Sequence, residues 1–285
     1  MGYTFRFLSP DRKGELFETF LEAFGDYAID ISGYRQETFI NRAIKNGVDF
    51  ESSVGLYDGE RMVGYTLIGI DTWKGAPSAY DIGTGIAKPH RGKGLARGMF
   101  EHALPRLRDL GARTFVLEVL QRNEPAIKAY EKTGFEITRG FDCFELSWDR
   151  IEKTETEEIV PLERENLDLF EPALDWRPSW ENSFASIRRI PDEVSLYGAL
   201  IDGAPRGLIV YYPALDWIMS VVVEREYRRR GVGSSLVRFL GGAIGGVQRR
   251  ARLVNVQHDD SGMIRFLQRL GFERFVSQYE MEMEI

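Results

Sequence analysis

Cysteine is nearly absent from this sequence, since Cys143 is the single one among 285 residues. A lone cysteine cannot close an internal disulfide, so we expect a protein of a reducing compartment, the cytoplasm. Long apolar runs are absent too, and no stretch approaches the roughly 18 uncharged apolar residues that a membrane span needs. Residues 1–16 lack a basic segment followed by an apolar one, so neither a secretory signal nor a membrane association is expected.

Positive charge is also in short supply. The 37 lysines and arginines are outnumbered by 44 aspartates and glutamates, which leaves a formal net charge of −7. A general nucleic-acid binder needs surplus cations to displace counterions from phosphates, so no nucleic-acid partner is predicted. Histidine is scarce as well, and neither His102 nor His258 has a partner at the spacing of metal ligands. No metal site is therefore predicted.

The sequence contains the same pattern of elements twice. Asp58-Gly59 and Asp202-Gly203 each lie between two apolar, β-rich runs, which predicts two β-hairpins with tight turns. Another predicted strand follows each hairpin, 80–87 in the first half and 217–224 in the second. A glycine-bearing turn, an amphipathic helix, a strand, a second helix and a Gly-Phe pair then follow in both halves. This order indicates a duplicated domain.

The spacing of glycines supports the duplication. Gly94 and Gly134 lie 40 residues apart (134 − 94), and so do Gly231 and Gly271 (271 − 231). Two insertion-free spans of equal length are hard to explain by coincidence, so the two halves are read as copies of one unit.

Two domains are therefore predicted, 1–150 and 151–285, with the boundary near Ile151. Strands alternate with helices in both halves, which favours the α/β class. We expect each copy to contain a central twisted mixed sheet flanked by helices.

The turn over residues 91–96, Arg-Gly-Lys-Gly-Leu-Ala, joins a predicted strand to a predicted helix. A helix N-terminus exposes unpaired N–H groups and the positive end of the helix dipole, which suits the binding of a phosphate. Gly94 would let the backbone approach the anion, while Arg91 and Lys93 add positive charge. The turn matches neither the mononucleotide P-loop nor the dinucleotide fingerprint, which disfavours a nucleotide-binding protein. A plain strand-to-helix connection is the alternative.

The motif R-x-x-G-x-[GA] at 91–96 is followed by N-x-x-A-x-x-x-Y-x-x-x-G-F at 123–135. Together the two motifs resemble the GNAT superfamily of acyl-CoA-dependent N-acyltransferases. The matching residues of the first half are Arg91, Gly94, Ala96, Asn123, Ala126, Tyr130, Gly134 and Phe135. Those of the second half are Arg228, Gly231, Gly233, Gly271 and Phe272. The resemblance covers roughly 55–147 and 195–285.

The resemblance implies that acetyl-CoA is the cosubstrate and that two adjacent strands splay apart to admit its pantetheine arm. It implies these cofactor-binding residues: Ile86, Ala87 and Lys88 for the pantetheine amides, Arg91, Gly92, Lys93, Gly94, Leu95 and Ala96 for the pyrophosphate, and Asn123 for the cofactor arm. The corresponding loop residues of the second half are Arg228, Gly231 and Gly233.

The resemblance also places Tyr130 near the sulfur, as the acid that protonates the departing thiolate. A phenol with a pKa near 10 is protonated at pH 7 and suits this role, whereas packing on one helix face is the alternative. The attacking amine must lose a proton, and Asp81 and Glu118 on adjacent predicted strands are the candidate bases. A solvated strand residue is the alternative for either carboxylate.

Some residues near the motifs can be interpreted either as part of the site or as ordinary structural or surface residues. Trp73, Tyr80 and Trp148 are expected either as pocket walls or as buried aromatics. His90 is expected at the phosphate end of the site or on the surface. Cys143 is expected to pack in a strand rather than to act as a nucleophile.

The second half departs from the family pattern where chemistry is needed. Leu267 stands at the position of Tyr130, and Asp260 stands at that of Asn123. A leucine cannot protonate a thiolate, so we predict a degenerate domain with a structural or regulatory role and residual cofactor binding. Tyr279 is the residue that could return an acid to this half.

The sequence thus predicts an N-acetyltransferase that moves the acetyl group of acetyl-CoA to a primary amine of a small molecule or peptide. The expected route is direct attack within a ternary complex. The alternative is a non-catalytic acyl-CoA-binding sensor or regulatory module. Tyr130 beside an intact turn favours the enzyme, because a sensor has no use for an acid at the sulfur. A monomer or homodimer is expected, with acceptor choice assigned to 1–54 and 136–194.

Overall fold

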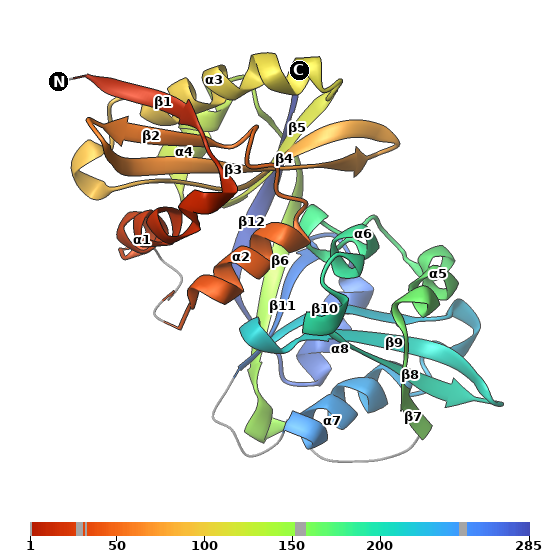
Figure 1. Ribbon diagram of the computed structural model, residues 1–285. Helices are drawn as coiled ribbons and strands as arrows, with labels where there is room; N and C mark the ends of the chain where they lie inside the picture. Colours follow the sequence, from red (N-terminus) through yellow and green to blue (C-terminus); the bar gives the residue numbers. More distant parts are fainter. Residues whose placement is uncertain (1, 27–30, 32, 152–157, 245–249) are drawn as a thin grey trace. The chain divides into compact units, whose positions relative to one another are not determined.

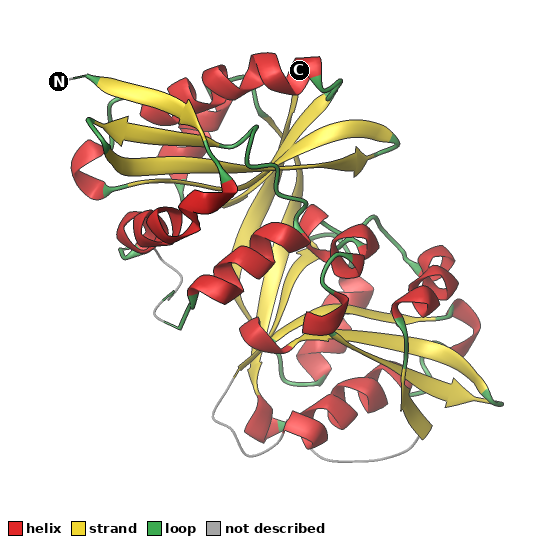
Figure 2. Ribbon diagram, viewed as in Figure 1, coloured by secondary structure: helices red, strands yellow, loops and turns green. Residues whose placement is uncertain are grey.

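The computed structural model describes residues 2–26, 31, 33–151, 158–244 and 250–285. The chain forms two compact units (Figure 1). Unit 1 consists of Met1–Thr138 and Tyr279–Ile285, and unit 2 consists of Arg139–Gln278. Each unit is a mixed sheet with helices packed on it, as Figure 2 shows, so the predicted α/β class is confirmed.

In unit 1 the strands follow the order β1-β2-β3-β4-β5-β12. Their bounds are β1 Tyr3–Phe7, β2 Val54–Asp58, β3 Arg61–Trp73, β4 Ala76–Ile86, β5 Thr114–Leu120 and β12 Glu273–Glu284. The hairpin predicted at Asp58-Gly59 joins β2 to β3. Neighbours from β1 to β4 are antiparallel, and β4 and β5 are parallel.

Helices cover both faces of this sheet. They are α1 Lys13–Phe24, α2 Gln36–Lys45, α3 Leu95–Asp109 and α4 Glu124–Glu131. On one face, Met99 and Phe100 of α3 and Ile127 of α4 pack in a core with strand residues such as Phe115. On the other face, aromatic side chains of α1 and α2 meet, and Phe39 lies edge-on to Tyr65 of β3.

Unit 2 repeats this arrangement with the strand order β6-β11-β10-β9-β8-β7. Its strands are β6 Glu136–Ser147, β7 Glu158–Pro161, β8 Ser195–Ile201, β9 Ala204–Tyr212, β10 Trp217–Val223 and β11 Arg250–Gln257. Its helices are α5 Leu167–Phe170, α6 Phe184–Arg188, α7 Val232–Ile244 and α8 Ser261–Arg269. The hairpin predicted at Asp202-Gly203 joins β8 to β9.

Short 3-10 turns connect many of these elements. They span Pro10–Arg12, Lys88–His90, Trp148–Arg150, Arg164–Asn166, Glu171–Ala173, Trp180–Asn182, Pro191–Glu193, Pro213–Leu215 and Arg225–Tyr227. Two of them, Lys88–His90 and Arg225–Tyr227, lead into the glycine-bearing turns and occupy equivalent places in the two units.

Two strands contribute residues to both units. The first residues of β6, up to Thr138, belong to unit 1, and the rest of the strand belongs to unit 2. Conversely, β12 begins in unit 2 and ends in unit 1, where Met281 and Met283 are buried in the core. Tyr279 packs against this same core, so the expectation that it serves the second half is wrong. The domain limits 1–150 and 151–285 stay a prediction.

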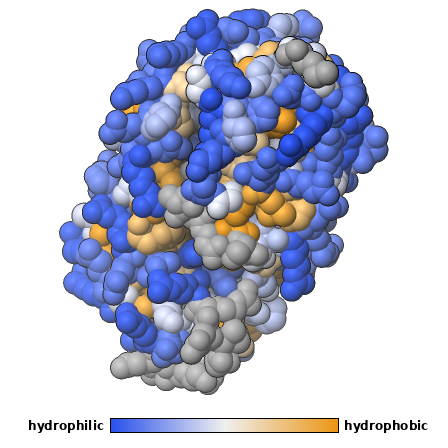
Figure 3. All heavy atoms as spheres, turned by 90° about the vertical axis from the view of Figure 1, so that its left-hand side faces the viewer, coloured by the Kyte–Doolittle hydropathy of each residue, from blue (hydrophilic) through white to orange (hydrophobic). Residues whose placement is uncertain are grey.

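Hydrophilic residues predominate on the face of the molecule drawn in Figure 3, and apolar residues gather in a few places. The large apolar residues that are most exposed come from different elements: Phe7, Leu21, Ile44, Leu110, Ile137 and Leu169. Single exposed apolar residues of this kind are normal in globular proteins. Within the described ranges, none of the helices has the length and apolar character for crossing a membrane.

Candidate active site

The candidate site of unit 1 begins where β4 and β5 part. Their parallel pairing runs from Ser78 opposite Thr114 to Asp81 opposite Leu117, and both strands continue beyond that last pair. On its other edge β4 carries a bulge, because Leu67 of β3 pairs with Gly83 whereas Ile68 pairs with Asp81. A bulge bends its strand locally and redirects side chains. Asp81 therefore lies at the point where the two strands diverge.

Neutral donors surround the carboxylate of Asp81, which is 6% exposed. The Thr84 hydroxyl lies 3.0 Å from Oδ1 and 2.9 Å from Oδ2, and the Thr66 hydroxyl lies 3.3 Å from Oδ1. The backbone N–H of Gly83 donates to Oδ1 at 3.1 Å. The phenol of Tyr130 also hydrogen-bonds to Asp81. The structure thus brings together two of the predicted catalytic residues.

Burial raises the pKa of Asp81 to about 7, although the hydrogen bonds from Thr84, Thr66, Gly83 and Tyr130 act in the opposite direction. Desolvation disfavours the charged form of a carboxyl group, while donors to the carboxylate favour it. A carboxyl group with a pKa near neutrality can take and release a proton at neutral pH.

Tyr130 is a residue of α4, and its side chain extends to Asp81. Its ring lies edge-on to Phe100 and Phe135, with ring centroids 5.9 and 5.8 Å away. The aromatic packing foreseen as the alternative therefore exists together with the hydrogen bond to Asp81. The packing fixes the ring, and the hydroxyl faces the carboxylate.

Glu118 is not placed with this pair. Its neighbours Leu117 and Val119 belong to the core beneath α3 and α4. Side chains alternate between the two faces of a strand, so Glu118 points to the opposite face of β5 from these two residues. Asp81 has the same parity as Ala79, which belongs to that core, so Asp81 and Glu118 lie on different faces.

The turn after β4 has the backbone that the glycines predict. Gly92 and Gly94 have φ angles of 77° and 74°, in the left-handed region that favours glycine, and α3 begins at Leu95. Lys93 donates to the phenol oxygen of Tyr3 at 2.7 Å, and this oxygen lies 2.9 Å from Nδ1 of His90. His90 and Lys93 are thus fixed beside the turn by a residue of β1.

Arg91 has a set of protein partners instead of an open guanidinium. Its Nε donates to the carbonyl of Ile86 at 2.8 Å, and its Nη2 donates to the carbonyl of Ala23 at 2.7 Å. Both Nη atoms pair with the carboxylate of Asp26 at 3.0 and 2.8 Å. This pairing holds the pKa of Asp26 below its usual range. Arg91 therefore ties the end of β4 to the end of α1.

Two of the predicted pantetheine-binding groups are also engaged within the protein. The Ile86 carbonyl accepts from Arg91, and the N–H of Ala87 donates to the carbonyl of Val63 at 2.8 Å. The Ala87 N–H is thus engaged by the protein, whereas the Ile86 carbonyl has a second lone pair that can accept another hydrogen bond. Asn123 caps α4, where its Oδ1 accepts from the N–H of Ala126 at 3.4 Å.

The aromatic residues and the cysteine are buried in the protein interior. Trp73, Tyr80 and Trp148 are between 2% and 5% exposed, so they are buried aromatics. Cys143 is buried in β6. Among the described residues no group of histidine, cysteine and carboxylate side chains could hold a metal ion.

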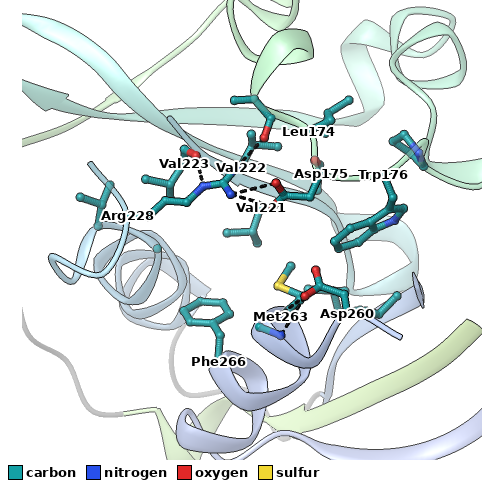
Figure 4. A pocket seen from close by; sticks show the side chains of 18 of the residues that line it. Leu174, Asp175, Trp176, Val221, Val222, Val223, Arg228, Asp260, Met263 and Phe266 are labelled. Carbon is teal, nitrogen blue, oxygen red and sulfur yellow. Dashed lines mark hydrogen bonds and ion pairs between the residues drawn. The ribbon is translucent and has the colours of Figure 1, made fainter. Parts of the chain in front are cut away.

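Unit 2 has a cavity of about 480 Å³ at the equivalent place (Figure 4). The pairing of β10 with β11 is at Trp217 and Arg252, and the cavity extends between the following residues of the two strands. Val221 of β10, Trp176 and Phe266 of α8 line it with apolar surface. The turn residues Arg228, Gly231 and Gly233 line it as well. This cavity could not be predicted from the sequence, because the side chains around it come from segments far apart in the chain.

Arg228 repeats the contacts of Arg91. Its Nε donates to the carbonyl of Val223 at 2.9 Å, and its Nη2 donates to that of Ala173 at 2.6 Å. Its Nη1 pairs with Asp175 at 2.7 and 2.9 Å (Figure 4). The two aspartates lie in segments without a recognisable motif, so sequence reasoning missed both ion pairs.

The polar cluster of unit 1 has no polar counterpart in unit 2. Aligning the two turns at Arg91 and Arg228 shifts the numbering by 137 (228 − 91). The positions of Asp81, Thr84 and Tyr130 are then held by Ile218, Val221 and Leu267, none of which can donate or accept a proton. Ile209 pairs with Val221 as Thr66 pairs with Thr84. Ile209, Ile218 and Leu267 are buried in an apolar core.

A glycine-bearing turn after a strand that parts from its neighbour, present twice, is the arrangement of a tandem acyltransferase fold. Residues 15–135 and 155–272 both match the acetyltransferase (GNAT) family. These two segments make up most of the chain, and the chain belongs to this family.

Similar proteins include acetyltransferases with different acceptors. A 78-residue segment is 37% identical to streptothricin acetyltransferase of Streptomyces lavendulae, and it covers 27% of this chain and 40% of that protein. A 91-residue segment is 33% identical to mycothiol acetyltransferase of Corynebacterium glutamicum, and it covers 32% of this chain and 30% of that protein. The chain thus matches less than half the length of either relative.

Solved structures share the whole fold. A tandem GNAT protein from the clavulanic acid biosynthesis pathway superposes with a TM-score of 0.75 at 16% identity, covering 99% of this chain and 98% of that one. A GCN5-related N-acetyltransferase from Sphaerobacter thermophilus gives a TM-score of 0.72 at 18% identity, covering 99% and 95%. At such identities the likeness concerns the fold alone.

Proposed function

We propose that unit 1 transfers the acetyl group of acetyl-CoA to a primary amine of a small molecule or peptide, within a ternary complex. The hydrogen bond between Asp81 and Tyr130, at the point where β4 and β5 diverge, carries this proposal. It places a carboxyl group with a pKa of about 7 beside a phenol, which is the acid and base pair that aminolysis of a thioester needs.

The reaction balances with these two groups alone. The amine nitrogen bonds to the thioester carbonyl carbon and passes a proton to Asp81. The carbon–sulfur bond then breaks, and the departing thiolate takes the proton of Tyr130. The proton held by Asp81 returns to Tyr130 along their hydrogen bond, so both groups are restored for the next turnover.

The turn over 91–96 would hold the pyrophosphate of acetyl-CoA. Gly92 and Gly94 give its backbone a left-handed path, and the 15-residue helix α3 starts directly after it. Lys93, held by Tyr3, supplies positive charge. In this proposal Arg91 does not bind phosphate, because it is committed to Asp26 and to two carbonyl groups; it keeps the turn in position.

The experiment that tests the function is thiol release from acetyl-CoA in the presence of a pooled library of primary amines, followed by mass spectrometry of the acetylated products. Activity that is lost in Asp81→Asn and reduced in Tyr130→Phe is the expected result. Turnover that both variants retain would show that the reaction does not use this pair.

A second function is favoured by the cavity in unit 2. We propose that unit 2 binds an acyl-CoA without transferring its acyl group, as a regulatory or stabilising module. The turn residues Gly231 and Gly233 line the cavity, whereas Ile218 and Leu267 replace the catalytic pair. Calorimetry with acetyl-CoA on the full chain tests this proposal, since two binding events are expected and Gly231→Glu should remove one of them.

The remaining expectations belong to the same proposal. The acceptor is a small amine or a peptide amine, nucleic acid and membrane are not partners, and the protein works in the cytoplasm as a monomer or homodimer. The acidic balance of the chain, −7 at pH 7, suits a cationic acceptor.

A further inference from the structure

Two hydroxyl groups next to Asp81 have no part in the mechanism above. Thr84 follows Asp81 on β4 and is half-buried, and Thr66 faces it from β3 and is fully buried. The two hydroxyl oxygens lie 2.7 Å apart. Thr84 lies within 3.0 Å of both carboxylate oxygens, and Thr66 lies 3.3 Å from Oδ1.

The number of hydrogens limits how these groups can bond. Each hydroxyl has one hydrogen to donate, and the two oxygens lie 2.7 Å apart, so one hydroxyl donates to the other. Either Thr84 donates to Thr66 and Thr66 donates to Oδ1, or Thr66 donates to Thr84 and Thr84 donates to one carboxylate oxygen. Both arrangements present a hydrogen to an ionised carboxylate. A protonated Asp81 would bring a further hydrogen into the same space and would have to displace one of these donors.

The groups that face Asp81 come from four elements. Thr66 belongs to β3, Thr84 and the N–H of Gly83 to β4, and Tyr130 to α4, while Leu117 of β5 is its pairing partner. The neighbouring Tyr65 points to the other face of β3, where it packs against Phe39. Tyr65 is a neutral phenol whose pKa is raised by burial and further by the charge of Asp81. In the described part of the chain, each hydrogen-bond donor to Asp81 is thus a neutral group.

We propose that Thr84, supported by Thr66, is a positioning residue that keeps Asp81 ionised and fixes its orientation toward the attacking amine. Without a cation in contact, donated hydrogen bonds are the means by which a buried carboxylate stays charged. The duplicate supports this role, because unit 2 has Val221 and Ile209 where unit 1 has the two hydroxyls and has also lost the carboxylate. This inference rests on the proposed function of unit 1.

The test uses Thr84→Val, which introduces the residue that unit 2 carries at the same position, and compares pH profiles of kcat/KM with one acceptor. We expect the acidic limb to move up by about one pH unit, because a donor to the carboxylate is lost. Activity should fall about tenfold at pH 6 and return to within about twofold of the wild type at pH 9. Thr66→Val should give a smaller shift in the same direction.

Two controls separate positioning from general damage. Thr84→Ser keeps the hydroxyl and should restore the wild-type profile. Thr72→Val makes the same change at an exposed position of β3 and should leave the profile unchanged. A uniform loss of activity at all pH values in Thr84→Val, without a shift of the limb, would overturn the proposal.

A readout without turnover distinguishes a failure of this inference from a failure of the proposed function. Carbon-13 NMR of carboxyl carbons follows the titration of Asp81 directly, with Asp81→Asn identifying its signal. A higher pKa of Asp81 in Thr84→Val supports the positioning role even if acetyl transfer is not found. An unchanged pKa removes that role even if acetyl transfer is confirmed.

Discussion

Unit 1 and unit 2 share the arginine contacts beside the glycine-bearing turn and differ in the residues at the positions of the candidate site. Arg91 and Arg228 each donate to a carbonyl at the end of a strand, to a second carbonyl in the preceding segment and to an aspartate. The hydroxyls, carboxylate and phenol of unit 1, in contrast, are replaced by aliphatic side chains. The arginine contacts beside the turn are therefore retained in both units, whereas the polar cluster at Asp81 is found in unit 1 and not at the equivalent positions of unit 2.

This difference also concerns burial. In unit 1 the carboxyl group of Asp81 is 6% exposed, and this burial disfavours its charged form. Neutral hydrogen-bond donors offset part of that cost. In unit 2 the same positions form an apolar core without that cost. Replacement of a buried polar cluster by aliphatic packing can increase the stability of a unit.

Substitutions at Asp81 and Tyr130, the proposed acid–base pair, should have the strongest effect on activity. Asp81→Asn should lower kcat about 10³-fold, and Tyr130→Phe about 10²-fold, because proton transfer to or from the reacting groups is lost. Steady-state thiol release measures both. The matched change in unit 2, Leu267→Phe, should leave kcat within about twofold. A larger loss from Leu267→Phe than from Tyr130→Phe would place the active site in unit 2.

Removal of residues 279–285 should have the second-largest effect on activity. Met281 and Met283 are buried in the core of unit 1, and large-to-small changes at such sites cost about 2–5 kcal/mol each. We expect a chain that ends at Gln278 to lose acetyl transfer and to show a lowered Tm. Residues 1–147 alone should behave in the same way, because they also lack this strand. Full activity of either fragment would contradict the role given to β12.

Measurements of acetyl-CoA affinity test the turn of unit 1. Gly94→Glu should weaken binding to unit 1 about 100-fold, because it adds bulk and a negative charge where the pyrophosphate would lie. Gly94→Asn is the control, since asparagine tolerates the φ of 74° and adds no charge. Calorimetry should show the loss in the glutamate variant, and equal affinities of the two variants would remove the turn from the binding site.

The smallest expected effect is on stability. The pKa of Asp81 is about 7 in the folded protein and about 4 when unfolded, so folding takes up a proton between these pH values. The contribution of Asp81 to stability is therefore greatest below about pH 4 and falls as the pH rises to 7. At pH 8 Asp81→Asn should raise the free energy of unfolding by about 1–2 kcal/mol, measured by urea denaturation, and at pH 4 the gain should vanish. A gain of equal size at both pH values would contradict the raised pKa.

Much of the fold could be predicted because its signals are local. The Asp-Gly turns and the repeated glycine spacing mark the two hairpins and the duplication, and both hairpins are confirmed. The partners of β6 and β12 could not be predicted, because an alternating strand pattern does not specify which sheet accepts the strand. Tyr279 was assigned to the wrong half for that reason.

Only part of the candidate site could be predicted from the sequence. The motif at 123–135 indicated Tyr130, and Asp81 was a candidate base because it lies on a predicted strand adjacent to that of Glu118. Asp26 and Asp175 lie outside both motifs, and their ion pairs join residues 65 and 53 positions apart in sequence. Thr66 and Thr84 carry no motif either. Their importance depends on the register of β3 and β4 and on a bulge, which are properties of the folded sheet.

The contribution of residues 279–285 to unit 1 has a consequence for biosynthesis. Residues 1–138 leave the ribosome first, but the strand that lies beside β5 is made about 140 residues later (279 − 138 = 141). At typical elongation rates of about 5–20 residues per second, this interval is about 7 to 28 seconds. During that time the nascent unit has an unpaired sheet edge at β5, which chaperones can recognise and which other nascent chains can pair with. The sheet of unit 1 is thus completed only after unit 2 has been synthesised.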